Sequence, residues 1–245
     1  MMTTKREFTA VITAAGNSRR MNNGGDGIKK EYCRLPETDE SVSVLSECLF
    51  KFLNTNIFNS VIITVPETDL QKAEQLVFSD RRIKAAIEKN NTKPIFTAGG
   101  KTRQKSVFNA LLKLSNSGCV PNYVLIHDGA RPWVSTSLIR QVCSLLEKNE
   151  AVVPCLSITD TPKIADETGK IITHLKRSAV YAAQTPQGFK FNKLLHAHKS
   201  AAKTEKEYTD DSEIYSDFAG EVFICKGETA NKKITFKEDL ECVRG

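Results

Sequence analysis

Two hydrophobic patterns alternate along the chain. Short apolar runs rich in β-branched residues predict buried strands from Phe8 and at 60–66, 93–100, 123–128, 151–157 and 222–227. Segments whose apolar positions recur every three or four residues predict helices at 42–54, from about 69, over 101–114, from 135, at 191–203 and at 209–219. A short strand and a capped helix are expected over 232–243. This alternation predicts an α/β protein with a parallel sheet that helices cover on both faces.

The alternation breaks between residues 158 and 183. Short extended segments there flank a Glu-Thr-Gly turn at 167–169, which is typical of a β-hairpin rather than of a strand–helix unit. An isolated two-stranded hairpin is marginally stable in water, so we expect this arm, at about 157–183, to pack against something. A second subunit is the economical partner. The sequence leaves open that the arm folds back on its own subunit.

Composition narrows the class of protein. With 245 residues, 40% of them hydrophobic, the chain can bury a core, and we interpret 1–245 as a single domain with the arm as a subdomain. The apolar stretches are too short to span a bilayer, and 5–7 lead into a strand rather than a signal-peptide core, so we expect a soluble cytoplasmic protein. The seven cysteines include no C-x-x-C pair and mostly lie among apolar residues, which favours reduced core thiols.

The net charge of +6 does not by itself indicate nucleic-acid binding. No zinc-finger spacing, RRM aromatic motif or long basic helix accompanies it, and the basic residues gather in loops instead. His196 and His198 would lie on different faces of a helix, so a metal site is not expected there. We therefore expect neither a nucleic-acid nor a membrane partner.

The stretch 8–30 carries the first candidate site. Its strand is followed by Ala14, Ala15 and Gly16, which leave room for close approach, and then by basic residues that flank a loop rich in Gly and Asn. Backbone N–H groups and cations together suit an anion with several oxygens, and we interpret it as a triphosphate. The stretch is neither a P-loop nor a G-x-G-x-x-G motif, and a solvated basic loop after an ordinary strand gives the same pattern.

A second candidate is Asp128. Ligands of an open parallel sheet bind beyond the carboxyl ends of its strands, where the loops 14–30, 99–106, 128–131 and 231–233 are expected. Asp128 is the one carboxylate that ends a strand between these loops, and Mg²⁺ suits it because this ion takes oxygen ligands and bridges phosphates. Alternatively, Asp128 only turns the chain and pairs with Arg131. Without a catalytic triad or carboxylate pair, the basic loops favour phosphoryl or nucleotidyl transfer.

Eight motifs together resemble one enzyme family. They are, in chain order, TAAGNSRRM, KKEY, GGKTRQKSV, HDGARP, TDTPK, AAQTPQGF, TDDSE and NKKIT. In this order, over about 11–240, they resemble the 2-C-methyl-D-erythritol 4-phosphate cytidylyltransferases of the non-mevalonate isoprenoid pathway. The related ribitol 5-phosphate cytidylyltransferases share most of the motifs, so the resemblance indicates the reaction more closely than the acceptor.

The resemblance implies a fold, a reaction and a set of site residues. The fold would be a Rossmann-like core in a homodimer with interlocking arms, and the enzyme would convert CTP and a polyol phosphate into a CDP-polyol and pyrophosphate with Mg²⁺. The acceptor phosphate would attack the α-phosphate of CTP in line and, being anionic, would need no general base. The resemblance implies catalytic roles for Arg20 and Lys30, nucleotide contacts from Ala14, Ala15, Gly16, Gly100, Ser106 and Lys233, metal binding by Asp128, and acceptor-phosphate contacts from Thr161 and Arg177 of the neighbouring subunit.

The chain departs from the family pattern in the loop 21–30, which is longer than usual, and at three residues. Lys29 stands where proline is common, Lys101 where aspartate is frequent, and Ala230 where many members have aspartate before Asn231. The last change leaves Asp128 and the substrate phosphates as the main metal ligands. A further hypothesis therefore stays open, in which the chain binds a nucleotide without turning it over.

Overall fold

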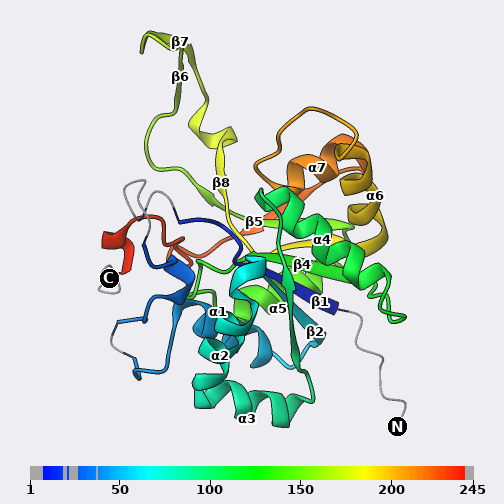
Figure 1. Cartoon of the computed structure of the whole chain (residues 1–245). Coiled ribbons are helices and arrows are strands. Elements are labelled where there is room, and N and C mark those ends of the chain that lie inside the picture. The colour runs from blue at the N-terminus through cyan, green and yellow to red at the C-terminus, as the bar shows by residue number, and fades with distance from the viewer. Residues whose placement is uncertain (1–7, 19–20, 22–26, 37, 241–245) are drawn as a thin grey trace.

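An eight-stranded mixed sheet forms the centre of the molecule (Figure 1). The computed structural model describes residues 8–18, 21, 27–36 and 38–240. The strands of the sheet are β1 (Phe8–Thr13), β2 (Phe58–Val65), β3 (Pro94–Ala98), β4 (Tyr123–Asp128), β5 (Ala151–Ser157), β8 (Tyr181–Ala183), β9 (Gln187–Lys190) and β10 (Phe223–Lys226). Their order is β10–β5–β9–β4–β1–β2–β3, with β8 paired to β5. The α/β fold with a mostly parallel sheet is thus confirmed.

The four strands β3, β2, β1 and β4 are parallel and end at one edge. Thr13 of β1 aligns with Thr64 of β2 and with Asp128 of β4, and Ala98 of β3 aligns with Val65. The loops that leave these strands therefore begin side by side, as the position of ligand sites in open parallel sheets requires.

Strand β9 was not predicted. It is antiparallel to both β4 and β5 and joins the two parallel parts of the sheet. It is short, and Gly188 weakens its strand propensity. Gly188 nevertheless fits because a Cβ there would lie 2.6 Å from Leu146 Cδ1 and 2.7 Å from Val142 Cγ1. Packing against the neighbouring helix, and not local sequence, places this strand.

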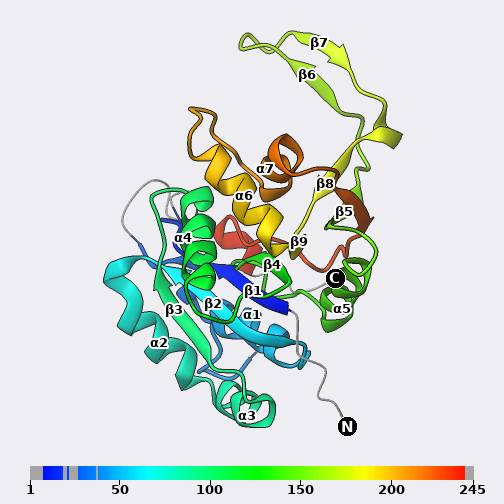
Figure 2. The ribbon, with the colours of Figure 1, turned by 90° about the vertical axis from the view of Figure 1, so that its right-hand side faces the viewer.

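Helices cover both faces of the sheet (Figure 2). One face carries α1 (Val44–Leu53), α2 (Leu70–Ser79), α3 (Arg81–Asn90) and α5 (Thr136–Leu145), and the other carries α4 (Arg103–Ser115), α6 (Phe191–Ala201) and α7 (Asp211–Phe218). Neighbours in β1 alternate between the two cores, because Ile12 packs with the first set and Val11 with the second. Among the described residues, no helix is long and apolar enough to cross a membrane.

Two expectations about helices and strands need correction. The helix predicted from about 69 is two helices, because Asp80 ends α2 and caps α3 by accepting from Arg82 N. The short strand predicted near 232–236 is absent, and the described part of the chain ends in the 3₁₀ turn η4 (Lys237–Leu240). The amides of Thr235 and Phe236 donate to Asp239 Oδ2 at 2.7 and 2.8 Å, so they are used by a local cap instead of a strand ladder.

The predicted hairpin forms and projects away from the sheet (Figures 1 and 2). Its strands β6 (Lys163–Ala165) and β7 (Ile171–His174) are antiparallel, and Asp166 accepts from the amides of Thr168 and Lys170 across the turn. The arm does not fold back on its own subunit. Ile164, Ile171 and Ile172 are therefore 43, 49 and 58% exposed in the single chain.

The six cysteines of the described residues are all free, but only half of them are buried as predicted for core thiols, and Cys119 is exposed. Cys48, Cys143 and Cys155 are buried. Burial raises the pKa of Cys143 to about 12, which leaves its thiol protonated and unreactive at neutral pH.

Candidate functional site

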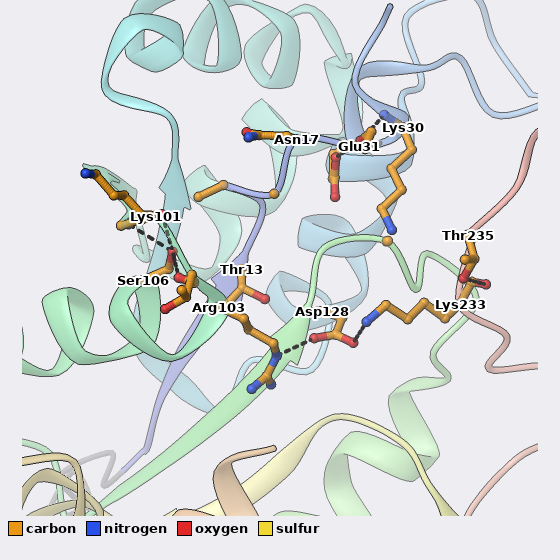
Figure 3. Close-up of a pocket in the computed structure, with 16 residues that line it drawn as sticks. Thr13, Asn17, Lys30, Glu31, Lys101, Arg103, Ser106, Asp128, Lys233 and Thr235 are labelled. Carbon is orange, nitrogen blue, oxygen red and sulfur yellow. Dashed lines mark hydrogen bonds and ion pairs between the residues drawn. The ribbon is translucent and has the colours of Figure 1, made fainter. Parts of the chain in front are cut away.

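A cavity of about 410 Å³ lies beyond the carboxyl ends of β1, β3 and β4 (Figure 3). Five segments line it: the loop after β1, the 3₁₀ turn η1 (Lys30–Tyr32), the start of α4 with the turn before it, the end of β4 with the loop after it, and the segment near Lys233. Its lining residues are Thr13, Ala15, Gly16, Asn17, Ser18, Lys30, Glu31, Gly100, Lys101, Thr102, Arg103, Ser106, Asp128, Ala130, Lys233 and Thr235. All the loops expected to form a site thus contribute to one cavity.

The small residues after β1 allow neighbouring loops to pack closely and also leave space beside the backbone. Ala14 is buried behind the cavity, where its amide donates to Thr64 O at 2.8 Å, and it does not line the cavity. A Cβ on Gly99 would lie 2.3 Å from Cβ of Ala15, so these two loops can meet only because both residues are small. Gly16, by contrast, faces open space, since a Cβ there would meet nothing within 4 Å.

Side chains at the start of α4 fix the conformation of the first turn of this helix beside the cavity. Thr102 caps the helix by accepting from Lys105 N at 3.1 Å. The buried Ser106 accepts from Gly100 N at 2.9 Å and donates to Thr102 O at 2.9 Å. Ser106 therefore fixes the glycine turn that precedes the helix, and the positive end of the helix dipole faces the cavity.

The two lysines at 29 and 30 have different contacts. Lys29 Nζ donates to Gly16 O and pins the loop after β1. Lys30 Nζ reaches across the cavity and donates to Ile234 O at 2.9 Å, while the Lys30 amide donates to Ser18 Oγ at 3.1 Å. Figure 3 shows the Lys30 side chain pointing to the part of the cavity that holds Asp128. Only Lys30 of this pair lines the cavity.

Glu31 was missed by the sequence analysis. Its side chain lines the cavity, the residue is 3% exposed, and Oε2 accepts from Ser18 Oγ at 3.4 Å. Burial raises the pKa of Glu31, and the nearby Lys30 and Lys29 oppose that rise. Apart from Asp128, Glu31 is the one carboxyl among the described residues that line this cavity, and only the acid in KKEY signalled it in the sequence.

Asp128 is surrounded by cations (Figure 3). Arg103 Nε donates to Oδ1 at 3.0 Å and Lys233 Nζ donates to Oδ2 at 2.7 Å from the opposite side. The Nε atom of Arg131 lies 3.8 Å from Oδ2, so the predicted Asp128–Arg131 pair exists but is the longest of the three contacts. We call these four residues the ion cluster. Burial opposes ionisation of Asp128, but the three cations hold its pKa well below the usual range.

A second cavity, of about 520 Å³, is also lined by the ion cluster, and all four residues of the cluster contribute to it. The other lining residues come from β8, the start of β9, the segment between them, and α7 with its cap: Ala183, Gln184, Thr185, Gln187, Thr209, Asp210, Ser212, Glu213 and Ser216. Arg103, Asp128 and Lys233 also line the first cavity, so these charged side chains lie where the two cavities adjoin.

His127 lies next to Asp128 in β4 and lines neither cavity. It is fully buried, and burial lowers its pKa to about 4. His127 Nε2 lies 3.2 Å from Arg131 O and donates to that carbonyl, so Nδ1 of the neutral ring accepts. Thr185 Oγ1, which accepts from Asp128 N at 3.1 Å, donates to this Nδ1 at 3.0 Å. The neutral imidazole thus fixes the end of β4 and the orientation of Asp128.

The structure brings most of the predicted site residues together. Ala15, Gly16, Lys30, Gly100, Ser106, Asp128 and Lys233 line the first cavity. Thr161 and Arg177 lie exposed on the arm and line neither cavity of their own chain, and Arg177 Nη1 donates to Thr159 O at 3.0 Å. Arg20 lies outside the described residues.

The residues fit a metal ion only as part of a complex with substrate. In the described part of the chain, no group of three or more His, Cys, Asp or Glu side chains could hold an ion. Each oxygen of Asp128 accepts one hydrogen bond and has a second lone pair available. One carboxylate with substrate phosphates is a usual way for proteins to hold Mg²⁺, and Asp128 meets that requirement.

Comparison with known proteins is consistent across sequence and structure. The family model for IspD, 2-C-methyl-D-erythritol 4-phosphate cytidylyltransferase, matches residues 8–244. The 2-C-methyl-D-erythritol 4-phosphate cytidylyltransferase of Clostridium beijerinckii is 33% identical over 232 residues, which cover 95% of this chain and 94% of that protein. The crystal structure of 4-diphosphocytidyl-2C-methyl-D-erythritol synthase from Anaerococcus prevotii aligns with a TM-score of 0.75 and 27% identity, covering 96% of this chain and 95% of that one.

Some relatives are longer. The bifunctional enzyme IspD/IspF of Brucella anthropi is 32% identical over 240 residues, which cover 98% of this chain but 55% of that protein. The chain thus spans about half the length of the bifunctional relatives that it matches.

Proposed function

The chain belongs to the 2-C-methyl-D-erythritol 4-phosphate cytidylyltransferase family, and we propose that it transfers the cytidylyl group of CTP to 2-C-methyl-D-erythritol 4-phosphate. The products are 4-diphosphocytidyl-2-C-methyl-D-erythritol and pyrophosphate, in isoprenoid precursor synthesis. The observation that carries this function is the ion cluster, which stands between two adjacent cavities. A reaction that joins a nucleotide to a second phosphate needs two such spaces and a cationic boundary between them.

In this proposal the first cavity takes CTP. It contains the N-terminus of α4, the loop after β1 and Lys30, all of which favour phosphate oxygens. Its volume of about 410 Å³ lies in the range of small-molecule sites. The second cavity takes the polyol phosphate, because Arg131, Lys233 and the hydroxyls of Thr185 and Thr209 line it.

The chain's own residues act by positioning and by charge. The acceptor phosphate is already ionised, which agrees with the neutral, buried His127 and with the absence, among the described residues, of a general base beside Asp128. Lys30 and Lys233 neutralise charge that builds up where the phosphate attacks the α-phosphate of CTP. Loss of one such group costs about 3–4 kcal/mol in transition-state stabilisation. The resemblance assigns a similar role to Arg20.

Mg²⁺ is proposed as the metal, held by Asp128 and by substrate phosphates. When bound, the ion neutralises and orients phosphate oxygens. Ala230 provides no second carboxylate, and the nearby Glu228 Oε1 instead accepts from Ser135 Oγ at 2.5 Å. In this proposal the protein therefore binds the ion through Asp128.

We propose a homodimer through the arm of a single nucleotidyltransferase domain. The exposed Ile164, Ile171 and Ile172 support this proposal, because an apolar hairpin that projects from its own subunit needs a partner surface. Thr161 and Arg177 would then reach the second cavity of the neighbouring subunit and hold the acceptor phosphate there.

A pyrophosphate-release assay with CTP and Mg²⁺ tests the function, with methylerythritol phosphate and ribitol 5-phosphate run side by side. Turnover with the first acceptor alone is expected. Preference for ribitol 5-phosphate would keep the two-cavity mechanism and change the acceptor, and CTP binding without turnover would favour the inactive nucleotide-binding alternative.

A pair of neighbouring lysines provides a matched control for the site. Lys233→Met is expected to lower kcat/KM on the order of 10²-fold, because it removes one cation from the boundary between the cavities. Lys232→Met, at the exposed neighbouring position, should leave the rate near that of the wild type. A wild-type rate for both variants would exclude Lys233 from the mechanism.

A further inference from the structure

Asp211 is a buried carboxylate outside the first cavity that contacts the ion cluster. It is the first residue of α7 and is 0% exposed. Its Oδ2 accepts from Arg103 Nη1 at 2.6 Å, and its Oδ1 lies 3.1 Å from His198 Nε2. Burial opposes its ionisation, yet Arg103 and the hydrogen bond from His198 hold the pKa of Asp211 below the usual range.

Arg103 is held between two carboxylates. Its Nε donates to Asp128 Oδ1 at 3.0 Å while its Nη1 donates to Asp211 Oδ2. The guanidinium is planar and carries five N–H donors in a fixed fork, so two contacts through different nitrogens fix the plane and the direction of the remaining three. Because Arg103 lines both cavities, this orientation decides which donors each cavity receives.

Asp211 also balances the charge at the boundary. The ion cluster holds one carboxylate and three cations, so it carries an excess of two positive charges. Asp211 lowers that excess to one without occupying either oxygen of Asp128. Without Asp211, Asp128 would be the only carboxylate that Arg103 contacts among the described residues, and the guanidinium could turn about that single contact.

His198 orients Asp211 in turn. It is fully buried on α6, and its ring stacks on Phe108 of α4 with centroids 6.0 Å apart and planes 13° from parallel. An ionised carboxylate only accepts hydrogen bonds, so the contact requires the His198 proton on Nε2. A buried series of contacts thus runs from α6 through α7 and the start of α4 to Asp128.

We propose that Asp211, oriented by His198, is a positioning residue for the transfer reaction and acts through Arg103. It fixes the guanidinium at the boundary between nucleotide and acceptor and keeps Asp128 available for its other contacts. The expected effect of Asp211 on the rate rests on the proposed function, whereas its expected effect on the orientation of Arg103 does not.

Asp211→Asn tests the proposal, with Asp217→Asn on the same helix as a control. Asn keeps the shape but removes the charge, and loss of a charge-assisted hydrogen bond predicts a fall in kcat/KM of about 10- to 100-fold for both substrates. Asp217 is 38% exposed and contacts Lys206 and Tyr208 OH, so its variant should keep the wild-type rate. Arg103→Lys should be as slow as the double variant Arg103→Lys/Asp211→Asn, because the two residues act as one unit.

A spectroscopic signal separates positioning from a general loss of structure. The Arg103 Nε–H resonance in a ¹⁵N spectrum, assigned by its disappearance in Arg103→Lys, should move toward the shifts of solvent-exposed arginines in Asp211→Asn and stay in place in Asp217→Asn. An unmoved resonance in Asp211→Asn, or a wild-type rate, would overturn the proposal. If the wild-type chain released no pyrophosphate with either acceptor, the proposed function would fail, while the resonance would still decide whether Asp211 positions Arg103.

A second pair of variants covers the case in which Asp211→Asn fails to fold. His198→Gln keeps an N–H donor near the position of Nε2, and His198→Leu removes it. The glutamine variant should keep the Arg103 resonance at its wild-type position and should retain most of the rate. In the leucine variant the resonance should move part of the way toward the position in Asp211→Asn, and the rate should fall in part. Equal behaviour of these two variants would contradict the proposed series of contacts.

Discussion

Asp128→Asn should strongly destabilise the fold, independently of its effect on catalysis. The substitution removes the negative charge that the ion cluster shares, and it leaves Arg103, Lys233 and Arg131 next to one another. Two contacts, at 3.0 and 2.7 Å, are charge-assisted hydrogen bonds, each worth about 1.5–3 kcal/mol. Breaking a buried ion pair from one side costs about 3–5 kcal/mol.

The lower end of that range applies here. The side chains of Arg103 and Lys233 are 26 and 34% exposed, so water screens part of their interaction with Asp128. We therefore expect a loss of about 3 kcal/mol in the free energy of unfolding. For a chain of this size, that corresponds to a fall in Tm of roughly 6–12 °C.

Urea unfolding at several pH values measures this effect. The pKa of Asp128 is lower in the folded than in the unfolded protein, so its stabilisation is complete above the unfolded value of about 3.9 and disappears as pH falls through the folded value. The difference between wild type and Asp128→Asn should be constant from pH 7 to about pH 5 and should shrink in more acidic solution.

Glu150→Gln is a matched control on the surface. Glu150 also bridges two cations, Lys190 and Lys193, but its side chain is 46% exposed. Its loss should cost less than about 1 kcal/mol. A similar cost for both variants at pH 7, or a difference at Asp128 that persists unchanged in acid, would refute the assignment of a buried, stabilising ion cluster.

Three further substitutions test the site. Lys30→Ala should lower kcat about 10²- to 10³-fold with any acceptor in the pyrophosphate assay, and an unchanged rate would remove Lys30 from the mechanism. Arg177→Ala should mainly raise the KM for the acceptor and leave that for CTP unchanged, and the reverse pattern would contradict a role for the arm in acceptor binding. Glu31→Gln should raise Tm at pH 8 but have no effect near pH 4, because a raised pKa in the folded state makes ionisation of Glu31 cost stability above the unfolded value of about 4.3. It should also tighten CTP binding in calorimetry, because it removes a negative charge from the cavity wall, and weaker binding would refute this reasoning.

The sequence by itself determined the local elements and where the parallel strands end. Strand and helix periodicities are set by neighbours along the chain, so β1, β2, β3, β4 and β5 and the helices α1, α4, α5, α6 and α7 could all be predicted. Because parallel strands end at one edge, their motifs also indicated that Lys30, Ser106 and Asp128 would meet.

The tertiary structure decided which charges pair. The sequence suggested Arg131, three positions away, as the alternative partner of Asp128, but its shorter contacts are to Arg103 and Lys233, which are 25 and 105 positions away. Arg103 is joined to Asp211 across 108 positions, and no local pattern indicates that contact. Antiparallel β9 is likewise placed by the helix packed on Gly188. Long-range contacts depend on how the helices and strands pack, and therefore on residues that sequence periodicity does not relate to one another.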